Sequence, residues 1–148
     1  MTTPLARLVQ IHKAIGHPVR LRLLAMLRGG PLCVCQMTVV VKLAASTVSQ
    51  HLAELRKAGL ITDRKDGRWV EYRLSDAAVG DGILDPVWPS LAGDPDAKAD
   101  ALLVKELRKI PLEELCGADL DLQRLDRPKL ASAIEKAEEI RCCNGSSR

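Results

Sequence analysis

Residues 44–74, AASTVSQHLAELRKAGLITDRKDGRWVEYRL, form the stretch that decides the fold. Its first part predicts a helix that has Ser46 as its N-cap and stops at Gly59. Two short segments of alternating apolar residues follow, and Asp66-Gly67 between them is typical of a tight β-hairpin turn. A helix followed directly by a hairpin is the order of a winged helix-turn-helix, which commonly places one helix in the DNA major groove.

Helical spacing of apolar residues predicts further helices on both sides of this stretch. Before it, one helix covers residues 5–15, a second opens at Pro18 and ends before Gly29, and a third covers about 34–43. The chain is therefore predicted to be mainly α-helical with a small β-hairpin, as a winged helix-turn-helix with a C-terminal helical extension. The apolar residues of the central helix that face the core are Val48, Leu52 and Leu55. The helices expected after the hairpin cover 86–92, 95–109, 111–116 and 128–142.

Composition and charge agree with a helical protein that binds a polyanion. The 148 residues are 47% hydrophobic, but phenylalanine is absent and aromatic residues make up 2%, so Leu, Val, Ile and Ala must fill the core. Residues 1–74 contain 12 Lys and Arg against 4 Asp and Glu, whereas residues 75–148 contain 10 against 15. The excess of positive charge lies in the half that contains the hairpin. Two differently solvated faces are the alternative explanation of this asymmetry.

The outward face of the central helix carries side chains that suit DNA. Gln50 can form a bidentate contact with adenine, and Ser49 and Thr47 can hydrogen-bond bases or phosphates. The basic hairpin tip suits phosphate or minor-groove contacts, which weaken with salt. A winged helix that binds protein is the alternative, and His51 is either a packed residue or a phosphate contact. The predicted DNA-contacting residues are Thr47, Ser49, Gln50, His51, Lys57, Arg64, Lys65 and Arg68.

The five cysteines suggest sulfur chemistry in a reducing compartment. No apolar run approaches the roughly 20 residues of a membrane span, and the N-terminus has no signal-peptide pattern. We therefore expect a cytoplasmic protein without membrane association, whose thiols stay reduced. Clustered thiols then suggest metal, metalloid or redox chemistry, although buried structural cysteines are the alternative. The cysteines are Cys33 and Cys35, the single Cys116, and the adjacent Cys142 and Cys143.

Three stretches of the chain resemble the ArsR/SmtB family of metalloregulatory repressors. They are AIGHPVRLRLLAMLRGGPLCVCQM, AASTVSQHLAELRKAGLI and DGRWVEYRL, and together they cover about residues 12–74. The resemblance implies a dimeric repressor that releases operator DNA when a metal or metalloid ion binds, with residues 5–15 and 95–109 as candidates for the dimer interface. Residues 1–110 are then the winged helix-turn-helix DNA-binding and dimerisation domain, and residues 111–148 are a helical C-terminal extension with a Cys-Cys tail.

The resemblance also places the sensing cysteines. The arsenic-responsive branch has a Cys-x-Cys pair at the start of the helix before the recognition helix, and LCVC at residues 32–35 stands in that place. A helix N-terminus is expected to lower the pKa of both thiols. Some arsenic sensors have a third cysteine where this chain has Thr38, so a third sulfur must come from elsewhere or two must suffice. Cys142 and Cys143 in the tail are a second candidate site.

The sequence thus predicts a DNA-binding transcriptional repressor and not an enzyme. Its expected inducer is As(III) or Sb(III), held by cysteine thiolates, and Cd(II) or Zn(II) are other ions for the same fold. A repressor whose cysteines are oxidised to a disulfide is the alternative. An enzyme is disfavoured because no base is paired with a cysteine and no phosphate loop is present. The expected partners are double-stranded operator DNA and a second copy of the chain, and the predicted metal ligands are Cys33, Cys35, Cys142 and Cys143.

Overall fold

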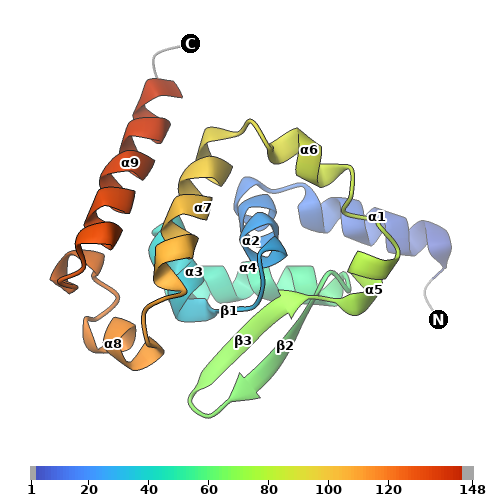
Figure 1. Ribbon diagram of the computed structural model, residues 1–148. Helices are drawn as coiled ribbons and strands as arrows, with labels where there is room; N and C mark the ends of the chain where they lie inside the picture. Colours follow the sequence, from blue (N-terminus) through green and yellow to red (C-terminus); the bar gives the residue numbers. More distant parts are fainter. Residues whose placement is uncertain (1–2, 145–148) are drawn as a thin grey trace.

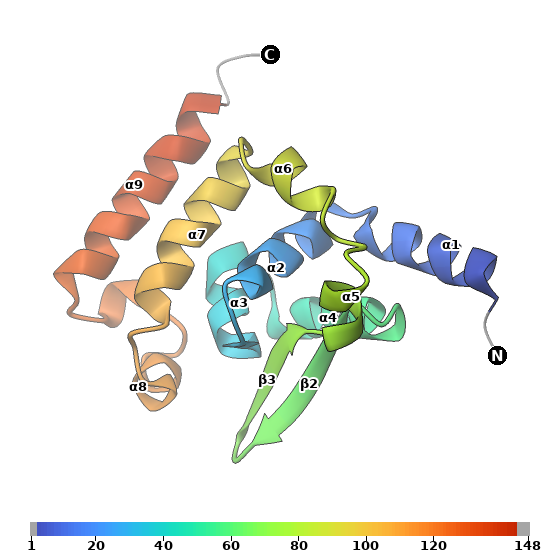
Figure 2. The same cartoon turned by 45° about the vertical axis from the view of Figure 1, so that its right-hand side comes forward.

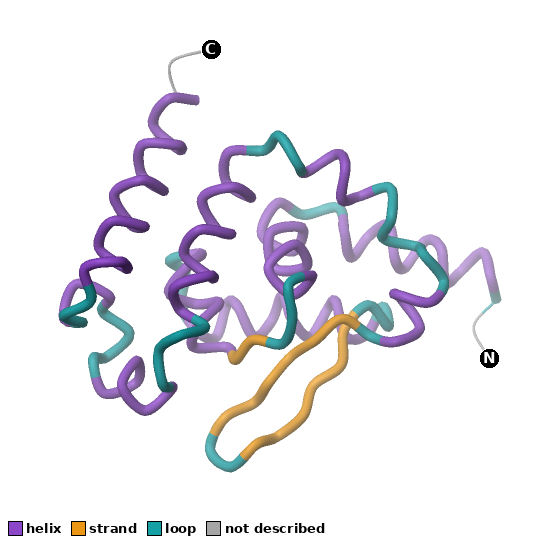
Figure 3. The backbone as a smooth tube through the Cα atoms, in the orientation of Figure 1, coloured by secondary structure: helices purple, strands orange, loops and turns teal. Residues whose placement is uncertain are grey.

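The computed structural model describes residues 3–144 and is dominated by helices (Figures 1 and 3). It confirms the predicted fold class and adds a third strand to the hairpin. No helix in this range is long and apolar enough to cross a membrane. In chain order the elements are α1 (Pro4–Ile15), α2 (Pro18–Arg28), β1 (Leu32–Cys33), α3 (Val34–Val41), α4 (Ala45–Lys57), β2 (Ile61–Asp66), β3 (Trp69–Leu74), α5 (Asp76–Gly80), α6 (Val87–Leu91), α7 (Pro95–Leu107), α8 (Leu112–Gly117), the 3-10 helix η1 (Leu122–Arg124) and α9 (Pro128–Asn144).

Helix α4 begins earlier than its sequence suggests. Ala44 is the N-cap and makes no side-chain capping hydrogen bond, so the prediction of Ser46 as the cap is wrong. The reason lies in the preceding turn, where α3 ends at Val41 and Lys42 adopts a left-handed φ of 56°. This sharp turn leaves only a short connection, and Ser46 therefore falls inside the first turn of the helix.

Helix α4 is terminated by the glycine that the sequence predicts. Gly59 has a φ of 75°, a conformation that glycine adopts without a Cβ penalty. Its N–H donates to the carbonyl of Arg56 at 2.9 Å, and the N–H of Leu60 donates to the carbonyl of Leu55 at 3.1 Å. These two bonds are the Schellman motif, which satisfies the last carbonyls of a helix and directs the chain into β2.

The inward face of α4 is the predicted one. Val48, Leu52 and Leu55 are 0% exposed, and α4 contacts both α2 and α3. Burying one such side chain contributes about 1.5–3 kcal/mol, so this row fixes the orientation of α4 and leaves its opposite face to solvent.

The sheet has the order β1-β3-β2, and its hairpin projects away from the helices as the wing (Figure 1). Asp66 pairs with Trp69, so the two turn residues are Gly67 and Arg68, one position later than predicted. The reason is that Gly67, with a φ of 58°, occupies the first central position of the turn, where a two-residue hairpin of this kind places glycine.

Strand β1 was not predicted, because it is only two residues long and is followed at once by a helix. Leu32 pairs with Tyr72 and Cys33 pairs with Glu71. The strand therefore anchors the start of α3 to the base of the wing.

The C-terminal half packs on the winged helix and on itself. Helix α7 contacts α2, α3 and α9, and α9 lies alongside α7 in both views (Figures 1 and 2). Leu103 and Leu107 of α7 are buried in this way. Part of the apolar surface of 95–109, which the family resemblance made a candidate for the dimer interface, is thus covered by the same chain, whereas Ala101 is exposed and Leu102 is half-buried.

Some helix boundaries in this half agree with the predictions and others differ. The Asp94 carboxylate caps α7 by accepting from the N–H of Ala97 at 2.9 Å, as its Asp-Pro sequence predicts. Helix α6 is shorter than expected and has Pro86 as its N-cap without a side-chain bond. Helix α5 and the short η1 were not predicted. Both are five residues or fewer, too short to show helical periodicity.

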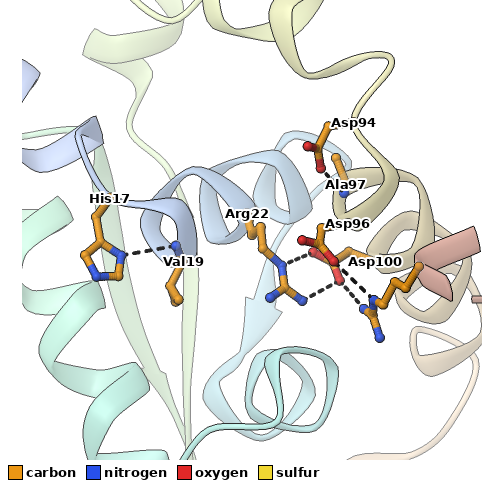
Figure 4. A network of polar contacts seen from close by, with 8 residues as sticks. His17, Val19, Arg22, Asp94, Asp96, Ala97 and Asp100 are labelled. Carbon is orange, nitrogen blue, oxygen red and sulfur yellow. Dashed lines mark hydrogen bonds and ion pairs between the residues drawn. The ribbon is translucent and has the colours of Figure 1, made fainter. Parts of the chain in front are cut away.

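A buried ion-pair network joins three helices (Figure 4). Asp100 of α7 accepts from Arg22 of α2 at 2.7 and 2.8 Å and from Arg141 of α9 at 2.8 Å. The hydrogen bonds that Arg22 donates to Asp100 raise the pKa of Arg22 above its ordinary value. Because all three partners lie on different helices, the network holds α9 against the winged-helix body.

Candidate nucleic-acid interface and cysteine sites

The outer face of α4 carries the side chains that the sequence assigned to DNA. Ser49, Gln50 and Lys57 are exposed, and Thr47 is half-buried near the start of the helix. Gln50 and Lys57 lie opposite the row that packs on α2 and α3, and Thr47 and Ser49 flank that outer face. Lys57 also pairs with Glu54 at 3.0 Å on the same surface, an exposed pair that contributes little to stability.

His51 is directed differently from these neighbours. It is half-buried, and its ring lies 4.5 Å from the ring of His17 at the N-cap of α2. Arg20 stands 3.4 Å from its Nδ1 atom. Burial, followed by the charges of His17 and Arg20, lowers the pKa of His51. The structure thus places His51 at the contact between α4 and α2.

The tip of the wing is basic and open. Arg64, Lys65 and Arg68 are exposed, and the guanidinium of Arg68 lies 5.0 Å from the centroid of the Trp69 ring. At the base of the wing, Arg56 of α4 pairs with Asp63 of β2 at 3.2 Å. This exposed pair adds to the packing contacts between α4 and β2, which connect the two predicted DNA-contacting surfaces.

The first cysteine pair lies where β1 becomes α3. Cys33 is the N-cap of α3 with extended backbone and is 6% exposed. Its N–H donates to Oε1 of Gln36 at 2.9 Å. Cys35 is the second residue of the helix and is half-buried. The pair therefore straddles the helix start, with one thiol on the strand side and one on the first turn.

The expected lowering of the thiol pKa values by the helix N-terminus is wrong. Burial raises the pKa of Cys33, with smaller contributions from Glu71, Asp66 and Cys116. Burial and the hydrogen bond from Cys116 raise the pKa of Cys35 to about 11. Desolvation disfavours the thiolate, and at Cys35 it exceeds the lowering of the pKa by a backbone hydrogen bond.

Cys116 lies close to the first cysteine pair, a position that the sequence did not predict. It lies on α8, and its thiol donates to the Sγ atom of Cys35 at 3.6 Å although 81 residues separate the two. No motif or spacing links these positions, so only the fold brings them together.

The tail pair lies elsewhere. Cys142 and Cys143 are exposed on the last turns of α9, at the end of that helix away from α8 (Figure 1). Across residues 3–144 no three His, Cys, Asp or Glu side chains are placed closely enough to hold a metal ion. The structure thus keeps the two predicted cysteine pairs apart.

Known proteins resemble this chain in the region of the winged helix. The family model "Bacterial regulatory protein, arsR family" matches residues 17–63. The arsenic resistance transcriptional regulator ArsR1 of Pseudomonas putida is 43% identical over 65 residues, which are 43% of this chain and 51% of that protein. The arsenical resistance operon repressor of Escherichia coli is 39% identical over 83 residues, covering 54% of this chain and 71% of the repressor. The solved structure of HlyU from Vibrio cholerae matches with 37% identity and a TM-score of 0.50, covering 56% of this chain and 90% of HlyU.

The chain thus spans about half the length of the first of these relatives and more than two thirds of the second. The matched relatives are transcriptional regulators, in agreement with the expectation that the chain is not an enzyme. The family model runs from the N-cap of α2 to β2 and so includes α3, α4 and the turn between them. The chain belongs to the arsR family of bacterial regulatory proteins.

Proposed function

We propose that the protein is a cytoplasmic transcriptional repressor that binds operator DNA as a homodimer and releases it when a thiophilic ion binds its cysteines. As(III) or Sb(III) is the first choice of ion, and Cd(II) or Zn(II) the next. One observation carries the proposal. Helix α3, which begins at the Cys33–Cys35 pair, contacts α4 directly, and α4 carries the exposed residues that suit base contacts. An ion held at the start of α3 therefore acts on the neighbour of the recognition helix.

The DNA contacts follow from the exposed chemistry of α4 and the wing. Thr47, Ser49 and Gln50 are assigned to base edges or nearby phosphates, and Lys57 to a phosphate. The basic wing tip is assigned to the backbone or minor groove. His51 acts mainly by positioning α4 on α2, since its ring faces His17.

A homodimer is supported by the surface of α1. Leu5, Leu8 and Val9 of this helix are 73, 48 and 44% exposed, and a row of apolar side chains at a helix surface favours burial against a partner. A two-fold dimer places two recognition helices about one turn of DNA apart. The division of the chain at residue 110 into a DNA-binding and dimerisation domain and an extension also stays a prediction.

The choice of arsenic-type ions is supported by the relatives and by sulfur chemistry. Two matched regulators are named for arsenic or arsenical resistance, and soft thiolates select such ions over hard ones. Cys142 and Cys143 are a second candidate site on α9. A redox-sensing repressor is the second candidate function, and the contact between Cys35 and Cys116 favours it, because two thiols 3.6 Å apart need little movement to form a disulfide.

A gel-shift assay on the DNA upstream of the protein's own gene tests the proposal. Arsenite, antimonite, Cd(II), Zn(II) and peroxide are added separately to the reduced protein. Release by arsenite that persists in the Cys142→Ser/Cys143→Ser double variant and fails in Cys35→Ser supports sensing at α3. Release lost only in the double variant moves the sensor to α9. Release by peroxide alone, reversed by dithiothreitol, replaces the ion-sensing proposal with the redox one.

A further inference from the structure

The contact between Cys35 and Cys116 is held by the fold on both sides. Arg108, at the end of α7, donates to the carbonyls of Pro31 at 2.7 Å and Gly30 at 2.8 Å. The loop that leads into β1 and α3 is thereby tied to the segment that leads into α8. Cys35 follows Pro31 by four residues and Cys116 follows Arg108 by eight, so the packing of these tied segments brings the two cysteines near each other.

Helix α8 is itself anchored. Leu115, the neighbour of Cys116, is 0% exposed, and Glu114 accepts from Arg127 at 3.0 and 2.6 Å. Helix α8 also contacts α3 directly. A short helix held by its core residue and by an ion pair presents Cys116 to Cys35 in a defined position.

The spacing of the two sulfur atoms suits a shared ion. Two sulfurs that each lie about 2.3 Å from one ion, with an S–ion–S angle between about 90° for a pyramidal centre and 110° for a tetrahedral one, are about 3.3–3.8 Å apart. The Sγ atoms of Cys35 and Cys116 are 3.6 Å apart. Both cysteines are half-buried, so neither is sealed in the core.

We infer that Cys116 is a ligand residue and that Cys35 and Cys116 together form a two-thiolate site for a monosubstituted trivalent arsenical. The inference rests on the proposed function and names the class of its ligand. Such an arsenical keeps one carbon substituent and needs two sulfurs, whereas inorganic As(III) takes three. Within residues 3–144 no third metal-ligating side chain joins the pair closely enough to make a three-ligand site.

The binding step is balanced without an oxidant. An arsenical of the form R–As=O reacts with the two thiols, two S–H bonds and the As=O bond are broken, two As–S bonds form, and one water leaves. Arsenic stays trivalent and both sulfurs stay at the thiol oxidation level. The product joins α8 to the second residue of α3. Movement of α3 then passes to α4 through their direct contact.

Phenylarsine oxide is the probe for this site, used on the reduced full-length protein. The exposed tail thiols bind the same probe, so all measurements use a Cys142→Ser/Cys143→Ser background. Binding is measured by intact mass under non-denaturing conditions and by competition against a soluble dithiol. We expect one equivalent to bind the background protein. We expect Cys35→Ser and Cys116→Ser each to weaken binding by at least about 100-fold, because the chelate is lost.

Controls separate a ligand role from a folding role. Cys116→Ala repeats the test without a polar group at a half-buried position. Thermal melts without probe identify any variant that does not fold. Equal binding by the background and both Cys116 variants overturns the inference. A background protein that binds no probe, yet forms a Cys35–Cys116 disulfide with peroxide, also overturns it.

The inference and the proposed function fail separately. If the probe binds through Cys35 and Cys116 but does not release DNA in the gel-shift assay, the two-thiolate site is supported. Its role in repression is then excluded. If arsenite releases DNA equally well from the background protein and from both Cys116 variants, the proposed function is supported. Cys116 is then not part of the sensing site.

Discussion

Arg22 holds the buried carboxylate of Asp100 with two hydrogen bonds, of 2.7 and 2.8 Å. Arg141 adds a third at 2.8 Å, so one aspartate on α7 joins α2 of the winged helix to α9 of the C-terminal half (Figure 4). Asp100 is 2% exposed. A carboxylate buried to this extent must be paired, and the docking of α9 therefore depends on it.

Asp100→Asn should be strongly destabilising. The change leaves the guanidinium groups of Arg22 and Arg141 facing a neutral amide, and breaking a buried ion pair in this way costs about 3–5 kcal/mol. Asp96→Asn is the matched control on the same helix, because Asp96 is 54% exposed and pairs with Arg141 at 3.4 Å; its cost should be about 0–1 kcal/mol. Urea denaturation followed by circular dichroism measures both, and equal losses would contradict the role assigned to Asp100.

The wing should supply affinity without sequence preference. Replacing Arg64, Lys65 and Arg68 by alanine should weaken binding to operator and to unrelated DNA alike. Each lost phosphate contact reduces the slope of log K against log salt by about 0.9. Lys136→Ala, an exposed position on α9, is the control and should leave the slope unchanged. Fluorescence anisotropy at several salt concentrations gives the slopes, and an unchanged slope in the triple variant would remove the wing from the interface.

Gln50 should supply sequence preference. Gln50→Ala should weaken operator binding by about 1–3 kcal/mol, the value of one bidentate base contact, and should leave binding to unrelated DNA nearly unchanged. Gln123→Ala, at an exposed glutamine of η1, is the matched control. Competition between operator and unrelated DNA measures the ratio of the two affinities. A proportional loss on both DNAs would show that Gln50 contacts the backbone.

Local rules account for most of the winged helix. The row Val48, Leu52 and Leu55 repeats with the period of a helix, and Gly59 ends that helix, so both were read from neighbouring residues. Strand β1 escaped prediction because its pairing with β3 joins residues about forty positions apart in the chain, Leu32 with Tyr72. Two apolar residues carry no period from which such a partner can be found.

The candidate site was less predictable than the fold, because burial and long-range contacts decide its chemistry. Sequence position alone put Cys33 and Cys35 at a helix start, where the dipole lowers a thiol pKa, yet desolvation raises both. Cys116 has no sequence signal that relates it to Cys35. The direction of His51 depended on the angle of α4 against α2, which periodicity fixes only approximately.

The raised pKa of Cys35 should be visible in its alkylation. Only the thiolate reacts with iodoacetamide, and the pKa of Cys35 lies at about 11, so its rate should rise about tenfold per pH unit up to pH 10. Peptide mapping by mass spectrometry resolves each cysteine. Cys142 and Cys143 are exposed and should be modified first. A Cys35 rate that levels off near pH 9 would contradict the effect of burial.

His51 should make the protein less stable in mild acid. Its pKa is lowered in the folded state, so below about pH 6.5 the unfolded chain binds more protons than the folded one, and the free energy of unfolding falls as the pH falls. His51→Gln should reduce the change in stability between pH 7.5 and 5, measured by urea denaturation. His12→Gln, at an exposed position on α1, keeps His51 and should retain the wild-type change. For each variant, the free energies of unfolding at the two pH values are subtracted from each other. A loss of packing against His17 lowers both values and therefore does not affect the difference. A His51→Gln protein with the full wild-type pH dependence would show that the proton binds elsewhere.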